Sequence, residues 1–168
     1  MTTRNHKYPR MQKMSQHYRN WLNKNEWHIA LTLNFDANVT KEQAEGTASY
    51  FWNKLDCELF GARQARKQNM RLPRACFLEG ENRIRNWHYH CAVQLPMNAE
   101  RIGNDVDEHV LAEEFAKLLK TRWEQLKEAG RYSVSELIEN KTKWIDYICK
   151  EEGFGDSAFC ARTSHLAA

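Results

Sequence analysis

The sequence lacks the features that would place it in a membrane, secreted or disordered class. None of its 168 residues belong to an apolar run long enough for a transmembrane helix. The first 25 residues are polar and basic, so we expect no secretory signal in them. The chain is 42% hydrophobic and 28% charged, which is ordinary for a globular domain and argues against disorder. This length is sufficient to bury a core without disulfides.

Cysteine pairs and a nucleotide-binding loop are also absent. The five cysteines are odd in number and form no Cys-x-x-Cys pair, which disfavours a disulfide framework and a zinc ribbon or finger. Free thiols are typical of a reducing compartment, so we expect a cytoplasmic protein. No Gly-x-x-x-x-Gly-Lys-Ser/Thr motif occurs, so the chain carries no P-loop helicase.

Acidic residues are missing from two segments of this mildly basic chain, whose net charge is +3. Residues 1–24 and 61–74 contain cations and no acid. Such segregation favours a polyanion as partner, although two solvated loops remain the alternative. We expect five cations of the second segment to contact DNA phosphates: Arg63, Arg66, Lys67, Arg71 and Arg74.

Hydrophobic periodicity predicts an α+β fold. The predicted strands are 27–35, 75–81, 87–95 and 131–138, and the predicted helices are 41–60, 108–128 and 141–152. The middle two strands are close in sequence, which requires antiparallel pairing. We therefore expect one domain of ferredoxin-like or RRM-like type, with an antiparallel sheet of four or five strands. Helices would cover one face and leave the other open for a ligand.

The termini are expected to lie outside that domain. Residues 1–25 show no clean periodicity and predict a basic arm with at most one helical turn near Tyr18 to Leu22. The domain would then span 26–153, and 154–168 would form a weakly patterned tail.

His88-Tyr89-His90 is the first candidate site. Residues two apart on a strand point to the same face, so both imidazoles project side by side. Such a pair can bind a metal, although two histidines on a half-buried strand face give the same pattern.

Glu79 lies on the preceding strand and can complete that pair. Directly opposed residues of an antiparallel hairpin share a face, so Glu79 joins the histidines if it opposes His88 or His90. Glu81 has the same parity and remains an alternative. Two imidazoles and a carboxylate suit zinc, non-haem iron, Mn²⁺ or Mg²⁺, and ligand number alone does not choose among them.

Tyr147 and Lys150 form the third candidate pair. Residues three apart on a helix share a face, so the ammonium would lie beside the phenol. A neighbouring cation lowers the cost of a phenolate and offsets charge on a phosphate. An ordinary amphipathic helix also contains this spacing.

Together these motifs resemble the HUH endonucleases, in particular the single-tyrosine Rep-type initiators of rolling-circle replication. The family has a hydrophobic strand, a His-hydrophobic-His motif and a Tyr-x-x-Lys helix in this order. The matching segments here are 30–35, 88–90 and 147–150.

The resemblance implies a metal-dependent nickase of single-stranded DNA. Glu79, His88 and His90 would hold Mn²⁺ or Mg²⁺. Tyr147 would attack the scissile phosphate at a replication origin, leaving a 5′-phosphotyrosine and a free 3′-OH, and Lys150 would help to position the metal or the phosphate. The implied protein is a monomer of a plasmid or phage, working with a host helicase and polymerase and with no membrane.

Other functions remain open at this point. Single-tyrosine transposases share the histidine pair and the late tyrosine but favour glutamine where this chain has Glu151. A non-catalytic module for single-stranded nucleic acid needs neither Glu79 nor Tyr147. A zinc hydrolase would use the same ligands, with water as nucleophile.

Overall fold

The computed structural model describes residues 8–36, 38–80, 86–96, 107–130, 132–150 and 158–166. In chain order the elements are α1 (Tyr8–Leu22), β1 (Ile29–Asn34), α2 (Lys41–Phe60), α3 (Ala62–Lys67), β2 (Arg74–Glu79), β3 (His88–Val93), α4 (Glu108–Glu124), β4 (Val134–Leu137) and α5 (Lys141–Ile148). The four strands form one antiparallel sheet in the order β2-β3-β1-β4. The predicted α+β fold with a single antiparallel sheet is therefore confirmed.

Helices α2 and α4 cover the first face of the sheet. Alternate residues of β1, such as Leu31 and Leu33, enter a continuous core with Trp52 of α2 and Trp123 of α4. All four side chains are at most 1% exposed. Because successive strand residues point to opposite faces, the other parity of each strand faces away from this core.

Side-chain caps set the start of two helices, one on each face of the sheet. Thr40 accepts a hydrogen bond from the backbone of Gln43, and the Gln43 side chain accepts one from the backbone of Thr40, so the two residues form a capping box at the start of α2. The side chain of Asn140 accepts from the backbone of Lys143 at the start of α5. α5 therefore begins directly after the edge strand β4.

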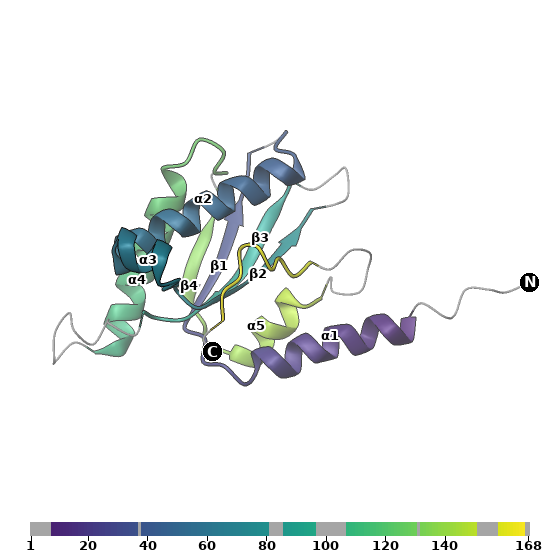
Figure 1. Ribbon diagram of the computed structural model, residues 1–168. Coiled ribbons are helices and arrows are strands. Elements are labelled where there is room, and N and C mark those ends of the chain that lie inside the picture. The colour runs from purple at the N-terminus through teal and green to yellow at the C-terminus, as the bar shows by residue number, and fades with distance from the viewer. Residues whose placement is uncertain are drawn as a thin grey trace, which may run out of the picture.

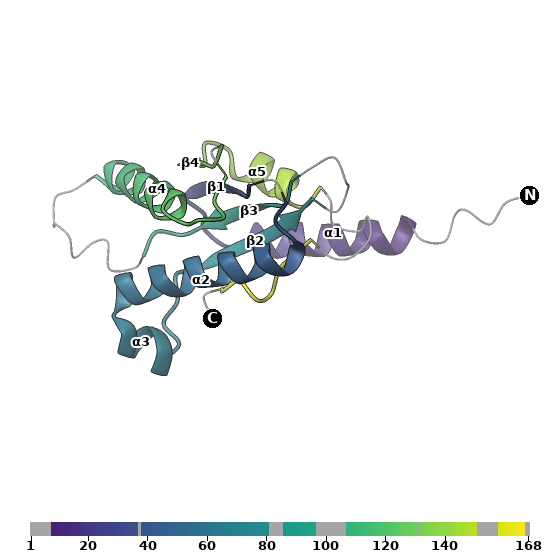
Figure 2. The same ribbon diagram turned by 90° about the horizontal axis from the view of Figure 1, so that it is seen from above.

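The second face is only partly open, which corrects the expectation of a bare face. α1 and α5 pack against its β2–β3 side through a second core of Leu22, Phe77, Ile145 and Ile148. Figure 2 shows α2 and α5 on opposite sides of the sheet, and Figure 1 shows α1 alongside α5. Residues 8–22 thus form a helix that closes this core instead of the predicted arm.

The predicted tail is also part of the fold. Residues 158–166 run along the edge strand β2 and form bridges at Phe77↔Phe159 and Arg74↔His165. The backbone N–H of Cys160 donates to the carbonyl of Cys76 at 2.9 Å. This segment supplies hydrogen bonds to an edge that would otherwise be unpaired.

Among the described residues, no helix combines the length and apolar character that crossing a membrane requires.

Candidate metal centre

The hairpin β2–β3 brings Glu79 and the two histidines together. Glu79 lies directly opposite His88 in the register, and His90 is two residues further along the same face. One ligand atom from each side chain lies within 4.8 Å of the others. The structure thus brings together the predicted ligand set with Glu79 as its carboxylate, whereas the alternative Glu81 lies outside the described residues.

Two of the three side chains have buried ligand atoms without a hydrogen-bond partner in the described part of the chain. Oε2 of Glu79 lies 3.5 Å from Nε2 of His88 and 3.7 Å from Nε2 of His90. Both Glu79 oxygens and Nε2 of His90 are buried without a hydrogen-bond partner among the described residues. Buried polar atoms are nearly always paired, so this cluster of orphaned donors fits a divalent cation.

Neighbouring oxygens orient both imidazoles. Nδ1 of His88 lies 3.0 Å from the carbonyl of Asn86, and because a carbonyl only accepts, this nitrogen carries the hydrogen. Nδ1 of His90 lies 3.1 Å from Oγ1 of Thr32, which is its register partner on β1. Both contacts leave Nε2 turned toward Glu79, as in metal sites whose outer contacts fix the ligands.

The electrostatic environment keeps the ligands in the protonation states that bind metal. Burial lowers the pKa of His90 to about 3, so its imidazole is neutral near pH 7. Burial acts to raise the pKa of Glu79, but His88, His90 and Lys150 outweigh it and hold that pKa below its ordinary value. A neutral imidazole and an ionised carboxylate need no deprotonation before a cation binds.

Tyr147 and Lys150 lie beside this centre. The centroid of the Tyr147 ring is 4.8 Å from that of His90, and the tyrosine is 44% exposed. Nζ of Lys150 is 3.2 Å from Oε2 of Glu79 and 3.7 Å from the centroid of the Tyr147 ring. The helix ends at Ile148, earlier than predicted, and Lys150 reaches the site from the following turn. The predicted metal ligands Glu79, His88 and His90 therefore lie together with Tyr147 and Lys150.

The predicted phosphate contacts lie elsewhere. Arg63, Arg66 and Lys67 are exposed on the short helix α3, which packs beside α2 and is well separated from α5 in both views (Figures 1 and 2). Arg71 donates to the carbonyl of Ala65. None of these side chains joins the metal centre.

Arg74 corrects the prediction of a phosphate contact. Its residue is 4% exposed, and its guanidinium donates to both carboxylate oxygens of Asp56, at 3.0 and 3.1 Å, and to the carbonyl of Thr163. A buried bidentate pair leaves no donor for a ligand at the surface. Arg74 therefore anchors α2 and the C-terminal segment to β2.

Two residues of the site escaped sequence reasoning. Thr32 contacts His90 from β1, and its register partner could be known only once the strands were paired. Trp144 stacks on Tyr147 with a centroid distance of 5.5 Å and an interplanar angle of 24°. Its position three residues before Tyr147 on a helix is the signal that would have found it.

Comparison with known proteins adds no assignment: no family model, curated protein or solved structure matches the chain.

Proposed function

We propose that the protein is a metal-dependent endonuclease that nicks and rejoins single-stranded DNA through a covalent link to Tyr147. The observation that carries this proposal is the convergence of an exposed tyrosine, a lysine and three side chains able to hold a metal on one face of the sheet. A divalent cation held by Glu79, His88 and His90, for which Mn²⁺ and Mg²⁺ are the proposed candidates, supplies Lewis-acid polarisation of a phosphodiester.

Tyr147 is the proposed nucleophile because it is both accessible and held in place. Its ring is fixed between Trp144 and His90, while 44% of the residue remains exposed for a DNA strand to approach. Attack of the phenol oxygen on phosphorus forms the Tyr147–phosphate bond and breaks the bond from phosphorus to the 3′ oxygen. The phenol proton ends on that 3′ oxygen, so the products are a 5′-phosphotyrosine and a 3′-OH.

Lys150 is proposed to balance charge at the reacting phosphate. Its ammonium lies between Glu79 and the face of the Tyr147 ring, at 3.2 Å and 3.7 Å. A fixed cation at this position lowers the energy of a phenolate and of additional negative charge on phosphorus. Rejoining is the reverse attack of a 3′-OH on the phosphotyrosine, which conserves the energy of the broken bond.

The test is covalent capture of DNA. Wild-type protein is incubated with Mn²⁺ and a pool of labelled single-stranded oligonucleotides with randomised centres, and the products are separated on a denaturing gel. We expect a slowly migrating protein–DNA band that disappears with EDTA and in Tyr147→Phe. Tyr132→Phe, which alters a tyrosine that is 85% exposed and belongs to no part of the centre, is the matched control and should keep the band.

Other results would assign another function. Cleavage that persists in Tyr147→Phe would identify a hydrolase with water as nucleophile. Salt-dependent binding without cleavage, even by a pool covering every short sequence, would identify a binding module.

The biological process we propose is initiation of rolling-circle replication of a plasmid or phage. The oligonucleotides recovered from the covalent band define a preferred sequence. A plasmid carrying that sequence should produce single-stranded circles in cells that express wild-type protein, and none with Tyr147→Phe. Excision of a flanked segment instead of replication would favour the single-tyrosine transposase.

A further inference from the structure

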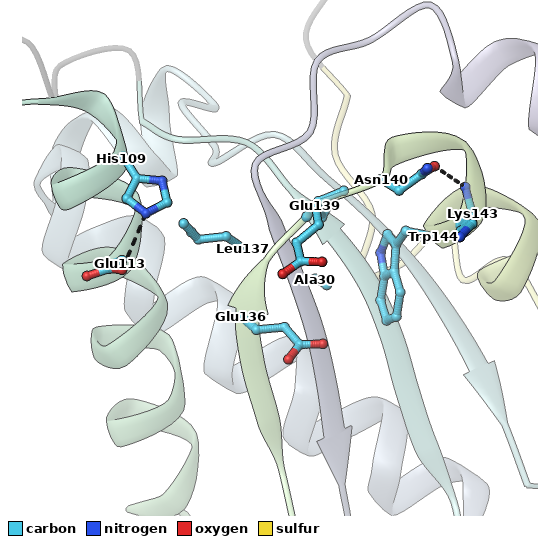
Figure 3. Close-up of a pocket in the computed structure, with 10 residues that line it drawn as sticks. Ala30, His109, Glu113, Glu136, Leu137, Glu139, Asn140, Lys143 and Trp144 are labelled. Atoms are coloured by element: carbon cyan, nitrogen blue, oxygen red, sulfur yellow. Dashed lines mark hydrogen bonds and ion pairs between the residues drawn. The ribbon is translucent and has the colours of Figure 1, made fainter.

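A groove lies on the open part of the second face, between β4 and α5. Its volume is about 620 Å³, within the usual range for ligand sites. Figure 3 shows it opening above β1, with α4 on the far side. The lining residues that matter here are Ala30, Glu136, Glu139 and Trp144. None of them is one of the proposed metal ligands.

Trp144 connects this groove to the proposed nucleophile. One face of its indole stacks on Tyr147, and its ring centroid is 5.9 Å from that of His90. The same side chain lines the groove and is only partly buried. Its Nε1–H is buried with no hydrogen-bond acceptor among the described residues. A strand of DNA whose phosphate lies at Tyr147 therefore has an aromatic platform one side chain away.

The opposite wall is negatively charged. Glu136 and Glu139 are exposed, and within the described part of the chain neither forms an ion pair. Figure 3 shows the carboxylate of Glu136 extending from β4 toward the side of Trp144, and that of Glu139, which follows β4, above it in this view. Carboxylates repel phosphate and can only accept hydrogen bonds. The wall formed by Glu136 and Glu139 is therefore suited to the donor-bearing edge of a nucleobase and repels phosphate, whereas Lys143 lines the groove on the side of Trp144.

The floor of the groove leaves room for a flat ring. Ala30 lies directly opposite Glu136 in the β1–β4 register, and its methyl group is the smallest side chain that a chiral residue can present. A larger residue at this position would occupy the space between Glu136 and Trp144.

From these observations we propose that the groove is a nucleobase subsite of the single-stranded DNA, and that it prefers guanine. The inference rests on the proposed function. Guanine presents two adjacent donors, N1–H and N2–H₂, that a carboxylate of Glu136 or Glu139 accepts as a pair, while its ring stacks on Trp144. Cytosine and adenine each offer a single exocyclic amino group, and thymine offers only one ring N–H. The expected order is guanine first and thymine last.

Binding without catalysis tests this subsite. Tyr147→Phe protein in EDTA is titrated with labelled eight-residue thymidine oligonucleotides that carry one guanine at successive positions, and binding is followed by fluorescence anisotropy. At one position we expect guanine to tighten binding by about tenfold, the scale of one good base contact. Glu136→Gln with Glu139→Gln should abolish this preference without weakening binding of the all-thymidine strand.

Further variants separate base recognition from general effects. Trp144→Leu should weaken binding of every oligonucleotide, while Trp144→Phe, which keeps an aromatic ring and the fold, should retain most of it. Glu124→Gln, which removes an exposed carboxylate of α4 that does not line the groove, is the charge control and should keep the guanine preference.

Three results would overturn the subsite. The first is that guanine tightens binding at no position of the oligonucleotide. The second is a guanine preference that survives the double glutamine variant. The third is that the groove binds an arginine-rich peptide instead of DNA. The last would identify the acidic wall as a site for a cationic protein partner. Because the assay requires neither metal nor the Tyr147 hydroxyl, a positive result with no covalent band would retain the subsite and reject the nickase. A covalent band without a guanine preference would retain the nickase and reject the subsite.

Discussion

The two faces of the sheet carry different chemistry on the same strands. Tyr89 points to the first face, is fully buried and donates a hydrogen bond to Sγ of Cys160. His88 and His90, its neighbours on either side, point to the second face, where Nε2 of His90 has no hydrogen-bond partner among the described residues. The first face packs into the larger core and stabilises the fold, whereas the second face carries the cluster of metal-ligand types, in which Glu79 and His90 have buried atoms without a hydrogen-bond partner among the described residues.

The position of the tryptophans follows the same division. Trp123 is fully buried beneath the first face and donates its N–H to the carbonyl of Asn34 at 3.2 Å. Trp144 lies on the second face, partly exposed, and its N–H has no acceptor in the part of the chain that the structure describes. The contrast predicts that substitutions on the first face change stability and those on the second change binding.

The largest stability effect should come from Trp123→Ala. Removing a fully buried tryptophan leaves a cavity in the core, and we expect a loss of about 3–5 kcal/mol in the free energy of unfolding. Trp144→Ala should cost about 1 kcal/mol, because its ring is partly in water. Urea unfolding measures both, and equal losses for the two variants would contradict the division of the faces.

Metal binding should stabilise the protein through the second face. A cation that binds the folded state and not the unfolded chain adds about 2.7 kcal/mol at a concentration one hundred times its dissociation constant. We expect Mn²⁺ to raise the melting temperature of the wild type and to leave that of His90→Gln unchanged. An equal increase in His90→Gln would place the metal elsewhere. Calorimetric scans with and without EDTA give the comparison.

Thr32 should set metal affinity without contacting metal. Thr32→Val keeps the shape of the side chain but removes the oxygen that lies 3.1 Å from Nδ1 of His90, so the ring loses its orientation. Loss of such an outer contact typically weakens metal binding by about 10–100-fold. Thr32→Ser restores an oxygen and should rescue affinity in titration calorimetry. If Thr32→Val binds Mn²⁺ as the wild type does, the hydroxyl has no positioning role.

A pH dependence of stability is also expected in metal-free protein. The pKa of His90 is about 3 in the folded state, below the ordinary value of 6.5. Between these values the unfolded chain binds a proton that the folded chain does not, so stability falls as the pH falls through this window. The slope contributed is at most about 1.4 kcal/mol per pH unit.

His90→Gln isolates that contribution because glutamine does not titrate. Unfolding free energies measured from pH 6.5 to 4 should decline less steeply for this variant than for the wild type. Glu79, whose pKa is held low, also loses stabilisation on acidification and adds a slope of the same sign. Parallel declines for the two proteins would show that His90 is protonated as readily in the folded state as in the unfolded state.

Local patterns were sufficient for the core of the fold. The helix predicted over 41–60 has those bounds, because Thr40 with Gln43 caps one end and Gly61, with a φ of 82°, ends the other. Alternation predicted β2 and β3 to within two residues at each end. The short turn between those strands made Glu79 a candidate partner of the histidines, and the register then decided that it shares their face.

The termini were misjudged because their order comes from distant contacts. Residues 15–22 lack a clean apolar period, yet Tyr18 packs against Phe77 and Phe159, which lie far away in the sequence. Residues 158–166 are ordered by backbone hydrogen bonds to β2, which leave little trace in side-chain pattern. Arg74 belongs to a basic segment of the sequence, but its partner Asp56 lies on helix α2.

The sequence by itself determined the order of the four strands and of helices α2, α4 and α5, the parity that separates Tyr89 from His88 and His90, and the residue types able to hold a metal. These follow from local periodicity, because a strand repeats every two residues and a helix every 3.6. The tertiary structure alone decided that Glu79 opposes His88, that Thr32 orients His90, and that Lys150 reaches Glu79 from beyond the end of α5. Each of these depends on the pairing and packing of elements distant in the chain, which no local pattern encodes.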